Sequence, residues 1–198
     1  VQNHPAWAGQ VDIAAVNGAT NVVISGADAA VQAVVTALET DGVEVRSLQV
    51  SHAFHSGLME PMLPEFGQVA GTISYSPPQI PLISNVTGDL AGDEIASAAY
   101  WCRHVRYPVR FAAGVETLVQ RQCPVALEIG PKPTLVNMAR RHLADVQPQA
   151  ATLHWLTSLR QGRSDWGQML RSLGTLYCLG ATPGWQAIDP SRSYQRIM

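Results

Sequence analysis

Hydrophobic and polar positions along the first part of the chain predict a hairpin followed by a helix and a strand. An apolar run at 11–18 ends in an Asn-Gly turn signal, and a second apolar run at 21–26 follows after two residues, so the two runs predict a β-hairpin. From Asp28, apolar side chains recur at helical spacing, and the helix is predicted to end near Asp41-Gly42. Residues 43–50 alternate in the manner of a strand. Together these residues predict most of a small α+β unit that lacks something at its start.

The rest of the chain predicts strands that alternate with helices. The expected strands are 81–88, 124–131 and 151–159, and the expected helices are about 57–70, 96–105, 108–122, 134–143 and 164–180. Pro61 and Pro64 interrupt the first of these helices, and Tyr107-Pro108 separates the second from the third. Such alternation predicts an α/β fold with a parallel sheet.

Composition and charge exclude several classes of protein. The 198 residues suffice for one domain or a large piece of a bigger one. The net charge is −2 with no run of like charges, which argues against nucleic acid as a partner. No apolar stretch is long enough to cross a membrane, and the first residues show no signal-peptide pattern. The chain does not begin with Met, so we expect residue 1 to follow an internal cut.

The cysteines indicate a reducing, cytoplasmic location. Cys102, Cys123 and Cys178 are odd in number and far apart, so neither a disulfide framework nor a zinc site is predicted.

The stretch VSHAFHSGLMEP, residues 50–61, carries the main candidate chemistry. His52 and His55 are three residues apart, a spacing that on a helix can bind one metal, but no acidic or thiol ligand pattern lies nearby. A histidine at a strand-to-helix junction also suits general acid/base catalysis. The third interpretation is two histidines that satisfy backbone groups at a helix start. No G-x-S-x-G sequence occurs, so a base here would lack that nucleophile motif within this chain.

His104 lies in a second candidate segment, WCRHVRYPVRF. Arg103, Arg106 and Arg110 surround it, and they predict either an anion site or a solvated basic helix end.

Five motifs give the chain a family resemblance. AAVNGATNVVISG, VSHAFHSGLMEPML, IPLISNVTG, YWCRHVRYPVRFAAGV and LEIGPKPTLVNM occur in the order and at the spacing found in acyltransferase domains of modular type I polyketide synthases. The chain resembles, more distantly, the malonyl-CoA:acyl-carrier-protein transacylases of fatty-acid synthesis. The resemblance covers about residues 11–140 and continues more weakly through a segment similar to the linker after the acyltransferase.

The resemblance implies a fold and a division into domains. The family fold is an α/β-hydrolase-like large subdomain with an inserted ferredoxin-like small subdomain. Residues 1–50 match the later part of the small subdomain, 51–148 the C-terminal part of the large one, and 149–198 the linker. Both subdomains are incomplete at the N-terminal side.

The resemblance also implies roles for individual residues. His55 matches the catalytic histidine, and His104 matches the position whose backbone carbonyl orients it. His52, Ala53 and Phe54 form, with His55, the HAFH sequence that resembles the malonyl-selecting version of a specificity motif. A phenylalanine there fills space that a methylmalonyl group would need. Asn17 matches an asparagine close to the family's acyl pocket.

The implied reaction transfers a malonyl group from malonyl-CoA, through an acyl-serine, to the phosphopantetheine thiol of an acyl carrier protein. No metal or redox cofactor is implied. The family's serine, carboxylate-binding arginine and glutamine oxyanion donor match no position of this chain, so we expect the fragment alone to be inactive. Two alternatives stay open, an editing acyl hydrolase of the same fold and a non-catalytic docking or linker piece. The expected partners are the acyl carrier protein, the missing N-terminal half of the domain and adjacent synthase domains.

Overall fold

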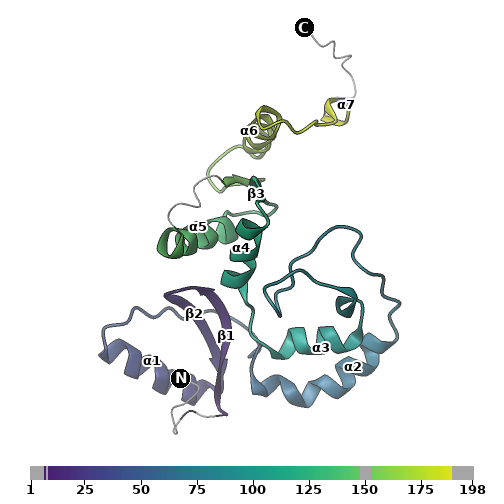
Figure 1. The fold of residues 1–198 in the computed structure, drawn as a ribbon. Helices are drawn as coiled ribbons and strands as arrows, with labels where there is room; N and C mark the ends of the chain where they lie inside the picture. Colours follow the sequence, from purple (N-terminus) through teal and green to yellow (C-terminus); the bar gives the residue numbers. More distant parts are fainter. Residues whose placement is uncertain (1–6, 8, 148–152, 189–198) are drawn as a thin grey trace. The chain divides into compact units, whose positions relative to one another are not determined.

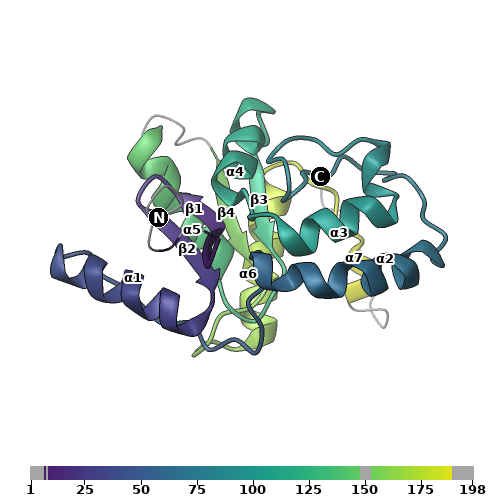
Figure 2. The same ribbon diagram turned by 90° about the horizontal axis from the view of Figure 1, so that it is seen from below.

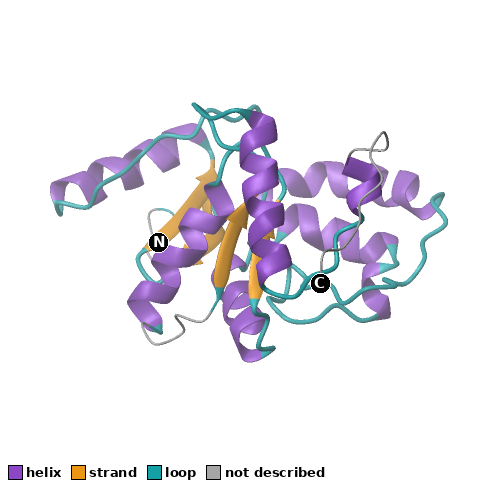
Figure 3. Ribbon diagram, turned by 90° about the horizontal axis from the view of Figure 1, so that it is seen from above, coloured by secondary structure: helices purple, strands orange, loops and turns teal. Residues whose placement is uncertain are grey.

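The computed structural model describes residues 7, 9–147 and 153–188. It shows the predicted α/β character, with helices and two small two-stranded sheets (Figure 3). The elements are β1 (Val11–Gly18), β2 (Asn21–Gly26), α1 (Asp28–Thr40), the 3-10 helix η1 (Gly57–Met62), α2 (Leu63–Gly71), the 3-10 helix η2 (Asp93–Ile95), α3 (Ala98–Arg106), α4 (Phe111–Gln120), β3 (Val125–Glu128), α5 (Thr134–Val146), β4 (His154–Thr157), α6 (Asp165–Cys178) and α7 (Trp185–Ile188). In these residues no helix combines the length and the apolar character that a membrane span requires.

The described residues group into two compact units. The first comprises the residues through Cys123 and those from 138 to 147, and the second comprises Pro124–Asn137 and 153–188. These units differ from the subdomains that the family resemblance implies, with boundaries at residues 50 and 148. Those subdomain boundaries stay predictions.

The predicted hairpin and first helix are confirmed. β1 and β2 pair antiparallel, from Val11 opposite Gly26 to Gly18 opposite Asn21. α1 lies against this hairpin (Figure 1) and buries Val34 completely beside Val11. The helix ends as expected, because Gly42 takes a left-handed conformation with φ 77° that glycine adopts without steric cost.

Two predicted strands are wrong. Residues 43–50 form no strand, and among the described residues they have no partner strand; Leu48 and Val50 are exposed. Residues 81–88 make one isolated antiparallel bridge, Ile83 with Leu90, and then turn back at Gly88. Alternation of polar and apolar side chains is typical of a strand, but a strand forms only where it pairs with a neighbouring strand.

The helix predicted over 57–70 divides into η1 and α2 because of its prolines. Pro61 lies inside η1, and a proline provides no N–H for the α-helical hydrogen bond. Ser56 caps η1, since its Oγ accepts from the backbone N–H of Leu58 at 3.3 Å. Pro64 lies in the first turn of α2, where an N–H would have no partner within the helix. α2 then packs beside α3 (Figures 1 and 2).

The break between α3 and α4 is confirmed and attaches this region to β1. Tyr107 is extended, with φ −92° and ψ 156°, as expected for the residue before a proline. Val109 then bridges to β1, accepting from the N–H of Val16 at 2.8 Å and donating to the carbonyl of Ala14 at 2.9 Å. The end of α3 is therefore fixed to the hairpin.

The second unit contains the parallel pair that the sequence predicts. β3 and β4 run parallel, from Val125 opposite His154 to Glu128 opposite Thr157. α6 lies against β4, where the buried Ser172 donates to the carbonyl of Thr157 at 2.7 Å. Ser164 caps α6 by accepting from the N–H of Gly167, as the sequence predicts.

Candidate active site

His55 lies in a strained turn between residues 43–54 and η1. Its φ is 64°, a left-handed conformation that costs an L-residue about 1–2 kcal/mol. The backbone N–H of His55 donates to the carbonyl of Val105 at 3.0 Å. Ser56, which is 1 % exposed, donates from its Oγ to the carbonyl of Ala53 at 2.7 Å and closes the turn. The fold thus holds His55 in a backbone conformation that it would seldom adopt on its own.

The imidazole of His55 is fixed through one of its nitrogens. Nδ1 lies 2.8 Å from the carbonyl oxygen of Tyr107, and a carbonyl only accepts, so Nδ1 carries the proton. In the neutral ring Nε2 is then a bare acceptor. Nε2 has no hydrogen-bond partner within the described residues, and His55 is partly exposed. This arrangement provides a base that is oriented and accessible.

The carbonyl that orients His55 differs from the one predicted. The resemblance pointed to His104, whereas the structure shows Tyr107 in that contact. His104 lies in the last turn of α3, and Tyr107 is the first extended residue after the helix. The proline that follows Tyr107 is the sequence signal that identifies this carbonyl, because it ends the helix there.

His104 contacts the site through its side chain. Its ring centroid lies 6.3 Å from that of His55, in an edge-on arrangement. Burial lowers the pKa of His104, and the neighbouring His55 lowers this pKa further. His104 is therefore held in its neutral form more firmly than an ordinary histidine.

The rings of His52 and Phe54 lie near the candidate base His55. The ring of Phe54 lies 6.2 Å from that of His52 and 6.4 Å from that of His55, and Phe54 is 48 % exposed. His52 Nδ1 lies 2.9 Å from Ser51 Oγ. In the part of the chain that the structure describes, no three His, Cys, Asp or Glu side chains come together as a metal site would require.

The arginines around His104 do not share one function. Arg106 forms ion pairs with Glu60 at 2.8 Å and with Asp12 at 3.4 Å, so its charge already has internal partners. Arg103 lies 6.0 Å above the ring of Tyr100. Sequence reasoning missed Asp12 and Glu60, which lie about 90 and 46 residues away from Arg106 along the chain.

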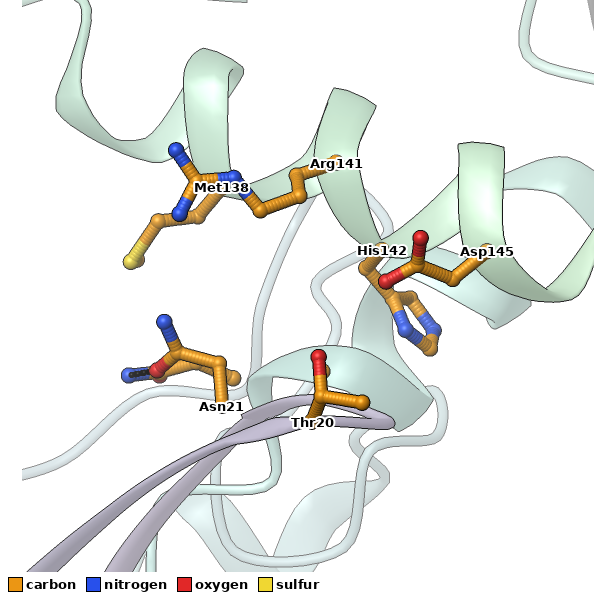
Figure 4. Close-up of a pocket in the computed structure, with 8 residues that line it drawn as sticks. Thr20, Asn21, Met138, Arg141, His142 and Asp145 are labelled. Carbon is orange, nitrogen blue, oxygen red and sulfur yellow. Dashed lines mark hydrogen bonds between the residues drawn. The ribbon is translucent and has the colours of Figure 1, made fainter. Parts of the chain in front are cut away.

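Asn17 lines a small pocket between the hairpin turn and α5 (Figure 4). Its Nδ2 donates to Asn21 Oδ1 at 3.3 Å. His142, 3 % exposed, forms the wall of this pocket; its Nε2 lies 2.9 Å from Glu116 Oε1, and its Nδ1 has no partner among the described residues. The cavity of about 10 Å³ has room for about one water molecule. His55 is not among the lining residues, so the role of Asn17 near an acyl pocket stays a prediction.

Comparison with known proteins identifies the family. The family described as acyl transferase domain matches residues 1–182. The spectinabilin polyketide synthase system protein NorB of Streptomyces orinoci is 40 % identical over 193 residues, which are 97 % of this chain and 9 % of that protein. The acyltransferase domain from the second module of the salinomycin polyketide synthase has a TM-score of 0.82 at 41 % identity, over 92 % of this chain and 42 % of that one.

A further solved structure shares the fold together with a carrier protein. It is PlMCAT:AntF, described as a type II acyl-carrier protein in complex with its malonyl-transacylase, with a TM-score of 0.72 at 25 % identity over 86 % of this chain and 52 % of that one. The chain thus spans under a tenth of the polyketide synthase protein NorB and about half or less of the two solved chains. On the match over residues 1–182, the chain belongs to the acyl transferase domain family.

Proposed function

We propose that this chain supplies the histidine half of a malonyl-transferring acyltransferase domain of a cytoplasmic polyketide synthase. The observation that carries the proposal is the His55 turn, which fixes Nδ1 on the Tyr107 carbonyl and leaves Nε2 free. A serine with no base beside it is a weak nucleophile. His55 has the geometry of the missing partner, and the serine lies in a part of the domain outside this chain.

The reaction follows from the properties of His55. Nε2 takes the serine proton as the serine oxygen attacks the thioester carbonyl of malonyl-CoA. The proton then goes to the sulfur of coenzyme A as the carbon–sulfur bond breaks, which leaves a malonyl-serine ester. In the second half, His55 deprotonates the phosphopantetheine thiol of an acyl carrier protein, which attacks the ester and restores the serine. The Tyr107 carbonyl stabilises the imidazolium that forms in each half. The chemistry needs no metal or redox cofactor.

Phe54 supports malonyl as the transferred group. Its ring stands beside both His52 and His55 and is half exposed, so it occupies space next to the reacting atoms. An α-methyl group on the substrate requires part of that space. A difference of one methyl group is worth about 1–3 kcal/mol, which corresponds to a selectivity of roughly 10- to 200-fold.

The family resemblance supports the rest of the assignment. We assign residues 1–50 to a ferredoxin-like small subdomain, 51–148 to a hydrolase-like large subdomain, and 149–198 to the linker that follows. The expected partners are the N-terminal half of the domain, the adjacent synthase domains and an acyl carrier protein. The PlMCAT:AntF complex shows such a carrier on a relative of the same fold.

The test joins this chain to the serine-bearing segment of its synthase and measures transfer of radiolabelled malonyl groups. We expect His55→Ala to lower transfer by about 10²–10⁴-fold, the usual contribution of general acid/base catalysis. His154→Ala is the matched control, because this exposed histidine lies on β4 and makes no contact with the Tyr107 carbonyl. Near-normal activity of His55→Ala would remove His55 from the mechanism.

Phe54→Ser tests the substrate assignment in the same assay. We expect the ratio of malonyl to methylmalonyl labelling to fall by at least about tenfold. An unchanged ratio contradicts the role of Phe54. Release of free malonate in place of transfer identifies the hydrolase alternative, and absence of any labelling favours the docking alternative.

A further inference from the structure

An ion-pair cluster lies directly behind the His55 turn. Asp12, on β1, accepts the backbone N–H of Gly57 through Oδ2 at 2.8 Å. The same oxygen lies 3.4 Å from Arg106 Nη1. Arg106 also donates from Nε to Glu60 Oε1 at 2.8 Å. The side chains of Asp12 and Arg106 are only 25 % and 22 % exposed, so water screens their attraction less than on an open surface.

Arg106 lies between the two residues that hold His55. The carbonyl of Val105 accepts the backbone N–H of His55, and the carbonyl of Tyr107 accepts from its ring. The ion pairs of Arg106 thus hold the residue that lies between these two carbonyls in the sequence. Asp12 holds the chain on the C-terminal side of His55, because it accepts the N–H of Gly57, two residues after His55.

Asp12 therefore contacts both parts of the His55 support. Asp12 accepts a hydrogen bond from the turn that carries His55. It also pairs with Arg106, which lies between Val105 and Tyr107 in the sequence. Gly57 lies close against the cluster, since a Cβ at this position would be 3.8 Å from both Asp12 Oδ2 and Arg106 Nη2.

We propose that Asp12 and Arg106 are positioning residues that hold the His55 imidazole with its proton on Nδ1. The inference rests on the proposed function of His55 as the base, and it extends that function to two residues that do not touch the reacting atoms. Asp12 keeps the turn and the Tyr107 carbonyl in the relative positions that the hydrogen bond between them requires. Without Asp12, Arg106 still pairs with Glu60 on η1, but no side chain among the described residues accepts the Gly57 N–H.

The position of the His55 proton is directly measurable in this chain. Two-bond proton–nitrogen correlation spectra distinguish imidazoles protonated on Nδ1 from those protonated on Nε2. In spectra recorded at about pH 8, we expect the neutral ring of His55 to be predominantly protonated on Nδ1. In Asp12→Ala, a substantial share of His55 should move to the form protonated on Nε2.

Asp12→Asn separates the two contacts of Asp12. Its amide oxygen can still accept from Gly57, but it carries no charge for Arg106, so we expect a smaller shift in the same direction. Should Asp12→Ala fail to fold, Asp12→Asn decides the question. A shift in Asp12→Ala alone assigns the effect to the Gly57 hydrogen bond and overturns the part assigned to Arg106.

Glu44→Ala is the matched control. It removes an ion pair at 2.7 Å with Arg46 whose side chains are 76 % and 84 % exposed. We expect no change in the His55 spectrum. If both Asp12 variants leave the Nδ1 population unchanged in a folded chain, the proposal is wrong.

The transfer assay provides a second readout. In the joined domain we expect Asp12→Ala to lower kcat by about 10- to 100-fold with little change in KM, because misplacement by about 1 Å costs up to that factor. The spectrum tests the positioning whether or not the domain transfers malonyl groups. Failure of the proposed function and failure of this inference therefore give different results.

Discussion

Glu128 is expected to stabilise the N-terminus of α5 by capping three backbone donors. Its Oε1 accepts the N–H groups of Thr134 and Leu135, both at 3.1 Å, and its Oε2 accepts that of Val136 at 2.9 Å. These donors have no partner within the helix, and a carboxylate there also opposes the positive end of the helix dipole. The prediction is that Glu128→Ala destabilises the chain.

The magnitude follows from which donors water can reach. Thr134 and Leu135 are exposed, so water replaces the carboxylate at their N–H groups. Val136 is 7 % exposed, and its N–H is sheltered. A hydrogen bond to a charged group contributes about 1.5–3 kcal/mol, and the charge at the helix end adds about 0.3–1 kcal/mol. We therefore expect Glu128→Ala to lower the free energy of unfolding by roughly 2–4 kcal/mol.

Urea unfolding followed by circular dichroism measures this loss. Glu128→Gln keeps acceptor oxygen but no charge, so its loss should be about 1 kcal/mol. Glu44→Ala removes a carboxylate from an exposed ion pair and should cost at most about 1 kcal/mol. If Glu128→Ala costs no more than Glu44→Ala, the three contacts do not act as a cap, and the reasoning fails.

Two further predictions concern the buried Tyr100 and the partly buried His104 near the candidate site. Tyr100→Phe leaves the Oγ of Ser84 without the hydroxyl that lies 2.7 Å away, and because both residues are at most 2 % exposed, unfolding by urea should show a loss of about 1–3 kcal/mol; an unchanged midpoint contradicts the pairing. The pKa of His104 is lowered, so below the ordinary value of ~6.5 the unfolded chain binds a proton before the folded chain does, and stability should fall as the pH drops from about 7.5 to about 5.5. Melting temperatures of the chain and of His104→Gln test this, and equal pH slopes would refute it.

Elements with local signals were predictable from the sequence. The hairpin follows from the Asn-Gly turn, and α6 begins at its Ser164 cap. In such cases the residues that determine the element lie within a few positions of one another. Residues 43–50 and 81–88 carry strand patterns too, yet a strand requires hydrogen bonds to another strand, and the pattern says nothing about whether one is present.

The candidate site shows the same difference between local signals, which the sequence reveals, and contacts between distant residues, which it does not. His55 was found by the motif around it, but the support of His55 comes from distant parts of the chain. Asp12 lies 45 positions from the Gly57 N–H that it accepts, and Tyr107 lies 52 positions from the ring that it orients. No spacing in the sequence indicates these contacts. Only the break at Pro108 provided a local signal, and it favours Tyr107 over His104.

Two features of this chain lack an interaction partner among the described residues. Leu48 and Val50, 59 % and 72 % exposed, alternate as strand residues do but have no neighbouring strand within the described residues. A few residues later, His55 presents a bare Nε2 that has no proton donor in the same residues. Residues with a strand pattern require a neighbouring strand to pair with, and a histidine that acts as a base requires a nucleophile to deprotonate. The exposed apolar side chains and the unpaired imidazole nitrogen therefore lie within residues 48–55, and both follow from contacts that a local sequence pattern does not specify.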